Sequence, residues 1–410
     1  MACCDQPGLM PFEQGLDKIL ATVTPCTETE TVPLQLALNR VLAEPVSAKA
    51  QVPSCDNSAM DGYALRLADL TPGIALPVQA RALAGHPVLE ALKPGHCIRI
   101  MTGAAMPQGC DTVVMQENAE VTEAGVLFSK APPLGDNVRR AGENVTEGQV
   151  VGQPGQVLSA IDLGLLATVG VSEVLVVRKA RVALFSTGDE LRQPGEPLNY
   201  GDLYDSNRVA IHALLKRLGV EILDLGVIAD DPDAIRNAFK RGDQECDFVI
   251  TSGGVSVGEA DYTRDILTEM GDIDFWKLAI KPGKPLAFGR LEHSYFLGLP
   301  GNPVSSLVTL HLLGSQALRQ FMGIGHQPLK RLTAISLEAL KKSPGRMDFQ
   351  RGVWRQEDGE ITVSSTASNQ GSHVFSSLQN ANCYIALEQD RGPVKAGESV
   401  TLWLFDELMK

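Results

Sequence analysis

The feature that most constrains the fold is the stretch 247–284, where a short apolar run ends in glycines and is followed by carboxylates and lysines. The run at 248–251 has the length and β-branched content of a buried parallel strand. At Ser252, Gly253 and Gly254 backbone N–H groups can approach a ligand closely, because glycine has no Cβ atom. Strand, glycine turn, carboxylates and lysines in this order suit an anion held beside a metal ion.

Strand and helix patterns alternate on both sides of this stretch. The alternation is typical of a parallel sheet covered by helices, so we predict an open three-layer α/β domain over residues 179–327. Strands are expected at 182–185, 220–227, 248–251, 275–280 and 295–299, and helices at 206–218, from 231, at 263–270 and from 303 to about 321.

Ligands of open α/β sheets bind outside the carboxyl ends of the strands. Five successive loops after strands carry carboxylates, glycines or lysines here, which is hard to explain as surface decoration. The carboxylates are hard oxygen ligands suited to Mg²⁺ or another divalent cation, and the lysines can stabilise developing negative charge. The carboxylates are Glu190, Asp230, Glu259 and Asp261, and the lysines are Lys277, Lys281 and Lys284. Gly301 and Asn302, at a helix start, offer further N–H donors to an oxyanion.

Several classes of function are excluded or disfavoured. No Walker motif, no GxGxxG motif and no Ser-His-Asp or Cys-His arrangement is present, so metal-assisted work on a phosphoanhydride fits better than nucleophilic catalysis. The net charge of −13 argues against a nucleic-acid binder. No apolar run approaches 20 residues and the eight cysteines form no CxxC pair, which favours a cytoplasmic protein with reduced thiols and no membrane contact. These patterns leave the substrate unidentified.

The rest of the chain predicts three further domains. Helical periodicity at 12–23, 36–42 and 159–169 suggests that residues 1–50 and 146–178 pack together as a linking domain. Short apolar runs cut by Pro and Gly predict an inserted β domain at 51–145 and a C-terminal β domain at 328–410. In the insert, the loops at 56–63 and 100–104 carry Asp61 and Thr102. Taken alone, each loop is more simply read as a turn that closes a hairpin.

At these residues the chain resembles the molybdenum insertase family, the molybdopterin molybdenumtransferases that include bacterial MoeA and the gephyrin E domain. The similar stretches span nearly the whole chain, including both β domains, and several exceed nine residues. They are DNSAMDGYA (56–64), IRIMTGA (98–104), RVALFSTGDEL (181–191), YDSNR (204–208), TSGGVSVGEADYT (251–263), FWKLAIKPGKPLAFG (275–289), GLPGNPVSS (298–306), DFQRG (348–352) and NQGSH (369–373).

The resemblance implies an α/β and β multidomain fold: an adenylyltransferase-like (MogA-like) three-layer domain, an inserted β domain, a helical/β linking domain and a C-terminal β-barrel-like domain. It implies an elongated homodimer whose active site lies between the three-layer domain of one subunit and the insert of the other. It also implies the reaction of adenylylated molybdopterin with molybdate, assisted by Mg²⁺, to give molybdenum cofactor and AMP. Transient contact with the molybdopterin adenylyltransferase is a further expectation.

The resemblance also assigns residues. The positions that the family treats as functional are Asp61, Thr102, Glu190, Asp230, Asp261, Lys277, Lys281, Pro300, Pro303 and Ser372, with Glu190 and Asp261 as the expected metal ligands. Arg351 and Ser372, with Lys281 or Lys284, resemble an oxyanion site for molybdate. One position departs from the pattern, because Asn144 stands where many members have a carboxylate. An amide cannot supply charge to a metal, and Glu143 is the possible substitute.

Two other readings stay open on the sequence. An enzyme that adenylylates molybdopterin with ATP would share the central domain, but such enzymes often consist of that domain alone. A dimeric scaffold that holds the cofactor for partner proteins would not need the charged strand-end loops. A nicotinamide- or inositol-related enzyme on the same fold has no motif in its favour.

Overall fold

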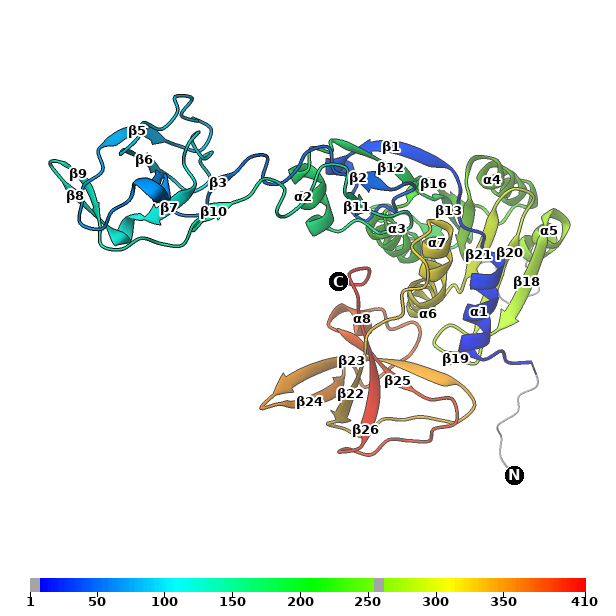
Figure 1. Cartoon of the computed structure of the whole chain (residues 1–410). Coiled ribbons are helices and arrows are strands. Elements are labelled where there is room, and N and C mark those ends of the chain that lie inside the picture. Colours follow the sequence, from blue (N-terminus) through cyan, green and yellow to red (C-terminus); the bar gives the residue numbers. More distant parts are fainter. Residues whose placement is uncertain (1–7, 254–261) are drawn as a thin grey trace. The chain divides into compact units, whose positions relative to one another are not determined.

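Figure 1 shows a computed structural model of the chain, which describes residues 8–253 and 262–410. Its contacts divide the chain into two compact units. The insert unit is Thr29–Val176, and the core unit combines Met1–Glu28 with Val177–Lys410. The four expected domain boundaries are finer than this division and stay a prediction.

The core unit is built on a six-stranded sheet in the order β16-β13-β17-β21-β20-β18. The first four strands are parallel to one another. At the other side of the sheet β20 pairs antiparallel with β21, and the edge strand β18 pairs antiparallel with β20. The strands are β16 (Glu221–Ile228), β13 (Arg181–Thr187), β17 (Phe248–Ser252), β21 (Tyr295–Leu299), β20 (Pro285–Arg290) and β18 (Asp272–Lys277). Every residue of β17 is buried, as expected for a parallel strand covered on both faces.

Helices cover both faces of this sheet, so the expected three-layer architecture is confirmed. Alternate residues of β13 enter different clusters: Leu184 packs with α3 and α6, and Phe185 packs with α4 and α5. The helices are α3 (Ser206–Leu218), α4 (Pro232–Glu245), α5 (Tyr262–Met270) and α6 (Pro303–Thr309), which continues through a π-helical turn (Leu310–Gly314) into α7 (Ser315–Phe321).

The antiparallel edge is where the sequence prediction was wrong. The strand expected at 275–280 lies at 272–277, and β20 was not expected at all. Two features hid β20: it begins with Pro285, and Gly289 interrupts its apolar pattern. A proline is tolerated at the first residue of a strand, and Gly289 lies so close to Asp272 of β18 that a Cβ atom would be 2.1 Å from the Asp272 carbonyl oxygen.

The C-terminal part of the core unit is a closed five-stranded barrel, which confirms the expected barrel-like domain. The strand order is β23-β24-β22-β26-β25, and β25 pairs back to β23. The strands are β22 (Arg331–Ser336), β23 (Met347–Glu357), β24 (Glu360–Ser365), β25 (Cys383–Leu387) and β26 (Ser399–Leu404), with α8 (Ser376–Gln379) before β25. The two-residue strand β19 (Ile280–Lys281) leaves the α/β domain and pairs in parallel with β23.

The first helix, α1 (Phe12–Thr22), does not pack with residues 146–178, contrary to the prediction from the sequence. Its buried residues Phe12 and Ile19 belong to the core cluster of the core unit rather than to that of residues 146–178. The Phe12 ring lies 5.7 Å from the ring of Phe349 and 5.6 Å from that of Trp403, both in the barrel. An amphipathic stripe predicts that one face of a helix is buried, but it does not identify the surface that buries it.

The insert unit contains a four-stranded sheet and one helix. The sheet order is β5-β6-β4-β7, and α2 begins with a capping box formed by Ser159 and Asp162. The bounds are β4 (Gly62–Leu65), β5 (Val78–Ala82), β6 (Cys97–Ile100), β7 (Thr112–Met115) and α2 (Ala160–Thr168). The helix expected at 36–42 is absent from this described stretch: a 3-10 turn (Leu34–Leu36) ends before Asn39, whose φ is 61°.

Short strand pairs complete the structure. They are β1 (Thr29–Pro33) with β12 (Glu173–Val177), β2 (Val46–Ser47) with β11 (Val150–Gly152), β3 (Asn57–Ser58) with β10 (Val138–Arg139), β8 (Ala119–Thr122) with β9 (Gly125–Phe128), and β14 (Leu191–Arg192) with β15 (Leu203–Tyr204). None of the helices in the described ranges is long and apolar enough to cross a membrane.

The packing of α1 gives the first prediction. Phe12→Ala should lower the free energy of unfolding by about 3 kcal/mol or more, because it leaves a cavity between two buried aromatic rings. Urea unfolding followed by tryptophan fluorescence would measure the change, since Trp403 lies in the affected cluster. Gln14→Ala, on the exposed side of the same helix, is the control. Equal stability of the two variants would contradict this placement of α1.

Candidate active site

Three acidic residues lie near one another at the carboxyl ends of β13 and β16. The Asp230 backbone N–H donates to Asp189 Oδ1 at 3.1 Å, and desolvation together with the charges of Asp189 and Glu190 raises the pKa of Asp230. All three residues are exposed. The structure therefore brings together the predicted residues Glu190 and Asp230 and adds Asp189, which the sequence reasoning missed although it directly precedes Glu190.

Gly188 shapes this carboxylate cluster. Its φ is +148°, and a Cβ atom there would lie 2.6 Å from Glu190 Oε2. The Glu190 side chain thus folds back over the glycine, and a residue with a Cβ atom would displace that side chain and strain the backbone. Hard oxygen donors gathered in this way fit a divalent cation, which would offset their mutual repulsion. Glu259 and the expected metal ligand Asp261 lie outside the described residues, as does Gly254.

A second group joins the ends of β17 and β21. Asn207, in the first turn of α3, donates through Nδ2 to Ser252 Oγ at 2.8 Å and to the Gly301 carbonyl oxygen at 2.7 Å. One amide group therefore fixes the two loops that were expected to cradle an anion. Asn207 is part of the YDSNR stretch but was not among the predicted site residues. An amide directly after the strand-end loop, at a helix start, was the available signal.

One predicted N–H donor, that of Gly253, and the nearby N–H of Val304, which was not predicted, are engaged within the protein. The Gly253 N–H donates to the Leu299 carbonyl oxygen at 3.2 Å, with Gly253 at a φ of +94° that favours glycine. The Val304 N–H, in the first turn of α6, donates to the Ser372 carbonyl oxygen at 3.0 Å. Asn302 does occupy the predicted N-cap position, but its side chain makes no capping hydrogen bond.

The contact of Val304 with Ser372 links the barrel to the α/β domain. It places Ser372 directly beside the start of α6, where Pro303 is the first residue and Pro300 and Gly301 precede it. The predicted residues Pro300, Gly301, Asn302, Pro303 and Ser372 therefore form one neighbourhood. Their roles toward a ligand stay a prediction.

The three predicted lysines lie around the antiparallel edge. Lys277 ends β18 opposite Pro285, the neighbour of Lys284. Lys281 lies in β19, and its Nζ is 3.3 Å from Asp348 Oδ2. The Lys281 side chain is 46% exposed, whereas that of Asp348 is 4% exposed, so the lysine head can still reach solvent or a ligand.

Arg351 is fully buried rather than exposed; it lies on the face of β23 that also carries Phe349, beneath the segment that holds Gly371 and Ser377. Its Nε donates to Ser377 Oγ at 3.0 Å and its Nη2 to the Gly371 carbonyl oxygen at 3.3 Å, while its own N–H donates to Gln370 Oε1 at 2.8 Å. Desolvation lowers the pKa of Arg351 to about 10. These contacts hold the loop before Ser372, so positioning that loop is what the geometry shows, and direct contact of Arg351 with an oxyanion stays a prediction.

In the insert unit, Asp61 and Thr102 are brought together as expected. Asp61 Oδ1 accepts hydrogen bonds from the Thr102 N–H and from Thr102 Oγ1, both at 2.7 Å, and these bonds hold the pKa of Asp61 below its ordinary value. Thr102 is exposed and Asp61 is half-buried. The same bonds also close the turn between the two loops, so this geometry agrees with the structural reading and with the functional one.

Glu143, the possible substitute for the missing carboxylate beside Asn144, has a structural partner. Its Oε2 accepts from the Arg140 N–H at 2.7 Å, and Arg140 pairs with Asp56 at 2.6 Å. These bonds stabilise the turn that ends at Asn144. A functional role of Glu143 stays a prediction.

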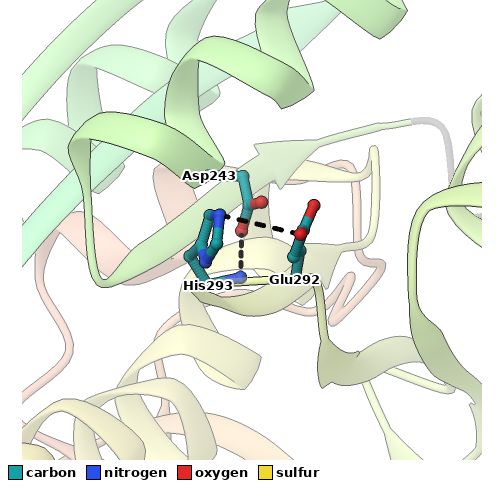
Figure 2. A group of neighbouring side chains, drawn as sticks. All are labelled: Asp243, Glu292 and His293. Atoms are coloured by element: carbon teal, nitrogen blue, oxygen red, sulfur yellow. Dashed lines mark hydrogen bonds and ion pairs between the residues drawn. The ribbon is translucent and has the colours of Figure 1, made fainter.

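Figure 2 shows the one group of metal-ligand side chains in the described ranges whose ligand atoms all lie within 4.8 Å: Asp243, Glu292 and His293. The group lies before the start of β21, at the amino-terminal end of the parallel strands, which is opposite the end that carries the strand-end loops. Asp243 Oδ1 accepts from the His293 N–H and from the N–H and hydroxyl of Ser294 at 2.8–3.0 Å. Asp243 thus clamps the turn between β20 and β21, which accounts for the group without a metal.

The exposed carboxylates Asp189, Glu190 and Asp230 are not such a group within the described part of the chain. A cation bound there would have to draw their side chains closer together.

Family models match the chain in three consecutive parts. A model of the MoeA N-terminal region (domains I and II) matches residues 10–170. A model of a probable molybdopterin binding domain matches residues 183–320, and one of the MoeA C-terminal region (domain IV) matches residues 333–405.

Similar proteins match over almost their whole length. The chain is 45% identical over 404 residues to a molybdopterin molybdenumtransferase of Haemophilus influenzae, covering 98% of this chain and 100% of that one. It is 38% identical over 384 residues to a molybdopterin molybdenumtransferase of a Nostoc species, covering 91% of this chain and 88% of that one. The crystal structure of the MoeA protein of Pyrococcus horikoshii superposes with a TM-score of 0.79 at 28% identity, covering 97% and 100%.

The fold and the strand-end loops define a multidomain protein built around a molybdopterin-binding type of α/β domain. The full-length similarity is more specific: the chain belongs to the MoeA family of molybdopterin molybdenumtransferases. The family resemblance expected from the sequence motifs is thereby confirmed.

The role of Asn207 gives the second prediction. Asn207→Ala should lower the free energy of unfolding by about 1–3 kcal/mol, because it leaves the buried Ser252 hydroxyl and the Gly301 carbonyl without their shared donor. Thermal or urea unfolding would measure the loss. Lys216→Ala, at an exposed position of the same helix, should change stability by about 0.5 kcal/mol or less. A similar small change for Asn207→Ala would show that the amide does not hold the loops.

The raised pKa of Asp230 gives the third prediction. A carboxyl whose folded pKa exceeds its unfolded value costs no stability below the unfolded pKa, and the cost grows as pH rises through the folded pKa. Asp230→Asn should therefore stabilise the protein at pH 7 by up to about 1 kcal/mol, since solvent screens this exposed group. The gain should vanish below about pH 4.

Thermal unfolding across this pH range would measure the gain. Asp274→Asn, an exposed carboxylate of β18, is the matched control. No gain for Asp230→Asn at pH 7 would show that the three strand-end carboxylates do not repel one another.

Proposed function

We propose that this protein inserts molybdate into adenylylated molybdopterin, giving the molybdenum cofactor and releasing AMP. The observation that carries the proposal is the 45% identity to a molybdopterin molybdenumtransferase over 98% of the chain. The conversion belongs to molybdenum cofactor biosynthesis. The geometry of the strand-end loops supports it, because carboxylates, a fixed glycine loop and lysines lie at the edge where an α/β sheet binds its ligands.

The carboxylate cluster would hold the divalent cation. Glu190 and Asp230 belong to the described cluster, and Asp261 is the further expected ligand. When bound, Mg²⁺ supplies positive charge that lowers the repulsion within the phosphoanhydride between the pterin phosphate and AMP. The donor set fits this ion, since it consists of hard carboxylate oxygens. The raised pKa of Asp230 implies that cation binding weakens as the solution becomes acidic and this carboxylate takes up a proton.

The loops tied by Asn207 would orient the adenylyl end of the substrate. Ser252 and Gly301 sit at fixed positions because one amide bridges them, and a site held this firmly needs little reorganisation when the substrate binds. Lys277 and Lys281 would stabilise the negative charge that develops on AMP as the anhydride is cleaved. Lys284 and Ser372 would contact molybdate, which is a tetrahedral dianion like phosphate.

The Asp61–Thr102 pair would complete the site from a second subunit. This part of the proposal makes the working protein a homodimer, in which a monomer carries only half of each site. Support comes from the pair itself, in which Thr102 is exposed, Asp61 is half-buried and two hydrogen bonds of 2.7 Å fix the geometry. Light scattering of the purified protein would test the dimer. We also infer a cytoplasmic location and transient contact with the molybdopterin adenylyltransferase that supplies the substrate.

The fourth prediction tests the reaction directly. Purified protein incubated with adenylylated molybdopterin, molybdate and Mg²⁺ should release AMP, whereas a molybdopterin adenylyltransferase would consume ATP. Asp261→Ala should reduce AMP release at least about a hundredfold through loss of a metal ligand. Its circular dichroism and thermal unfolding should match those of the native chain.

Asp265→Ala, at an exposed position in the first turn of α5, is the matched control and should keep normal release. Normal AMP release by Asp261→Ala would remove Asp261 from the metal site. ATP consumption without AMP release from the adenylylated pterin would overturn the proposed function.

A further inference from the structure

A small cavity lies beside Lys281, on the barrel side of the strand-end loops. It has a volume of about 150 Å³ and is lined by Lys281, Lys341, Lys342, Ser343, Pro344, Arg346 and Asp348. We propose that this basic pocket receives the tetrahedral oxyanion substrate before it reaches the strand-end site. The proposal rests on the proposed function, and apart from Lys281 none of these residues was predicted from the sequence.

The charges lining the cavity favour an anion. Four cationic side chains face one carboxylate, that of Asp348, although the whole chain carries a net charge of −13. Asp348 is nearly buried, lies 3.3 Å from Lys281 Nζ and also accepts from Gln350 Nε2 at 3.2 Å. A dianion approaching an acidic protein is repelled by most of its surface, so a local basic pocket decides where it binds.

Lys342 is the buried cation among the residues that line this basic pocket. Its residue is 5% exposed, and its Nζ donates to the carbonyl oxygens of Ser343, Arg391 and Gln389 at 2.9, 3.2 and 3.3 Å. Desolvation lowers the pKa of Lys342, and the charge of Lys281 adds to this effect while Asp348 opposes it. All three ammonium hydrogens serve the fold, so Lys342 contributes positive charge to the pocket without having to contact the ligand.

Lys341 and Arg346 supply the donors that remain available. Within the described ranges neither side chain has a hydrogen bond or ion-pair partner. Lys341 is exposed and Arg346 is half-buried. A guanidinium presents parallel N–H groups to two oxygens of an oxyanion, and a lysine adds a mobile point charge. With the half-exposed Lys281, Lys341 and Arg346 make three cationic residues that line the cavity and reach solvent.

The size of the cavity and its position identify the class of ligand. A space of about 150 Å³ holds a few waters or one small tetrahedral oxyanion, but not a nucleotide. The pairing of β19 with β23 sets Lys281 opposite Asp348. Lys281 therefore lines the pocket, and it is only three residues before Lys284 in the strand-end loop that follows. An oxyanion bound here competes with Asp348 for Lys281. Molybdate is the substrate with this chemistry, and sulfate shares its shape and charge.

The first experiment measures binding to the full-length chain. Isothermal titration with molybdate, in the absence of any pterin, should show a site for which sulfate competes. The double variant Lys341→Gln/Arg346→Gln should weaken molybdate binding at least about tenfold, since two charge-assisted contacts are lost. The control Lys330→Gln/Lys395→Gln removes the same charge from exposed positions of the same barrel and should stay within about twofold of the native affinity. Equal weakening in both double variants would overturn the pocket.

The second experiment separates this inference from the proposed function. AMP release measured against molybdate concentration should show KM for molybdate raised at least about tenfold in Lys341→Gln/Arg346→Gln, with a smaller change in kcat. Normal AMP release with an unchanged KM in this variant overturns the pocket but leaves the function in place. If the native chain releases no AMP but still binds molybdate, and the double variant binds it at least about tenfold more weakly, the proposed function is overturned and the pocket is retained. Unaltered thermal unfolding of the variant confirms that either result concerns binding.

Discussion

Parallel pairing of β16, β13, β17 and β21 is the constraint on which the site depends. Because these strands run in one direction, all their carboxyl ends lie at the same end of the sheet. Loops far apart in the sequence therefore become neighbours. Asn207 exploits this arrangement by bonding to the loop after β17 and to the loop after β21. Buried side chains on both faces of the sheet fix the strand register, so the loop ends inherit a rigid frame.

The joint between the α/β domain and the barrel is the second determinant. The pairing of β19 with β23 and the bond from Val304 to Ser372 hold the two parts together at the side where the strand-end loops lie. Buried cations mark this joint: Arg351 organises the loop before Ser372, and Lys342 holds three carbonyl groups. In the described ranges no carboxylate forms an ion pair with either side chain; their partners are carbonyl and hydroxyl oxygens. Their positive charge is therefore only partly neutralised. Both residues thus make the joint electropositive while serving the fold.

Much of the fold was predictable from local patterns. The caps of α2, α3 and α4 follow from Ser159, Asp205 and Asp231, each of which accepts a hydrogen bond three residues on. Local patterns failed where the covering surface decides the outcome. The stripe of α1 shows which side is buried, but its burial against Phe349 involves residues more than 300 positions away. The strand β20, which lies between β21 and the edge strand β18, was hidden by a proline and a glycine that only its pairing with β18 explains.

The sequence by itself determined the kind of chemistry and the family, because glycines, carboxylates and lysines after successive strands are readable in order, and long motifs identify the MoeA relatives. Tertiary structure alone decided which of these groups remain available. It turned the Gly253 and Val304 N–H groups toward carbonyl oxygens, buried Arg351, and placed Lys341 and Arg346 around a cavity beside Lys281. The physical reason is that a residue's type fixes what it can bind, whereas its availability depends on hydrogen bonds and burial set by distant parts of the chain.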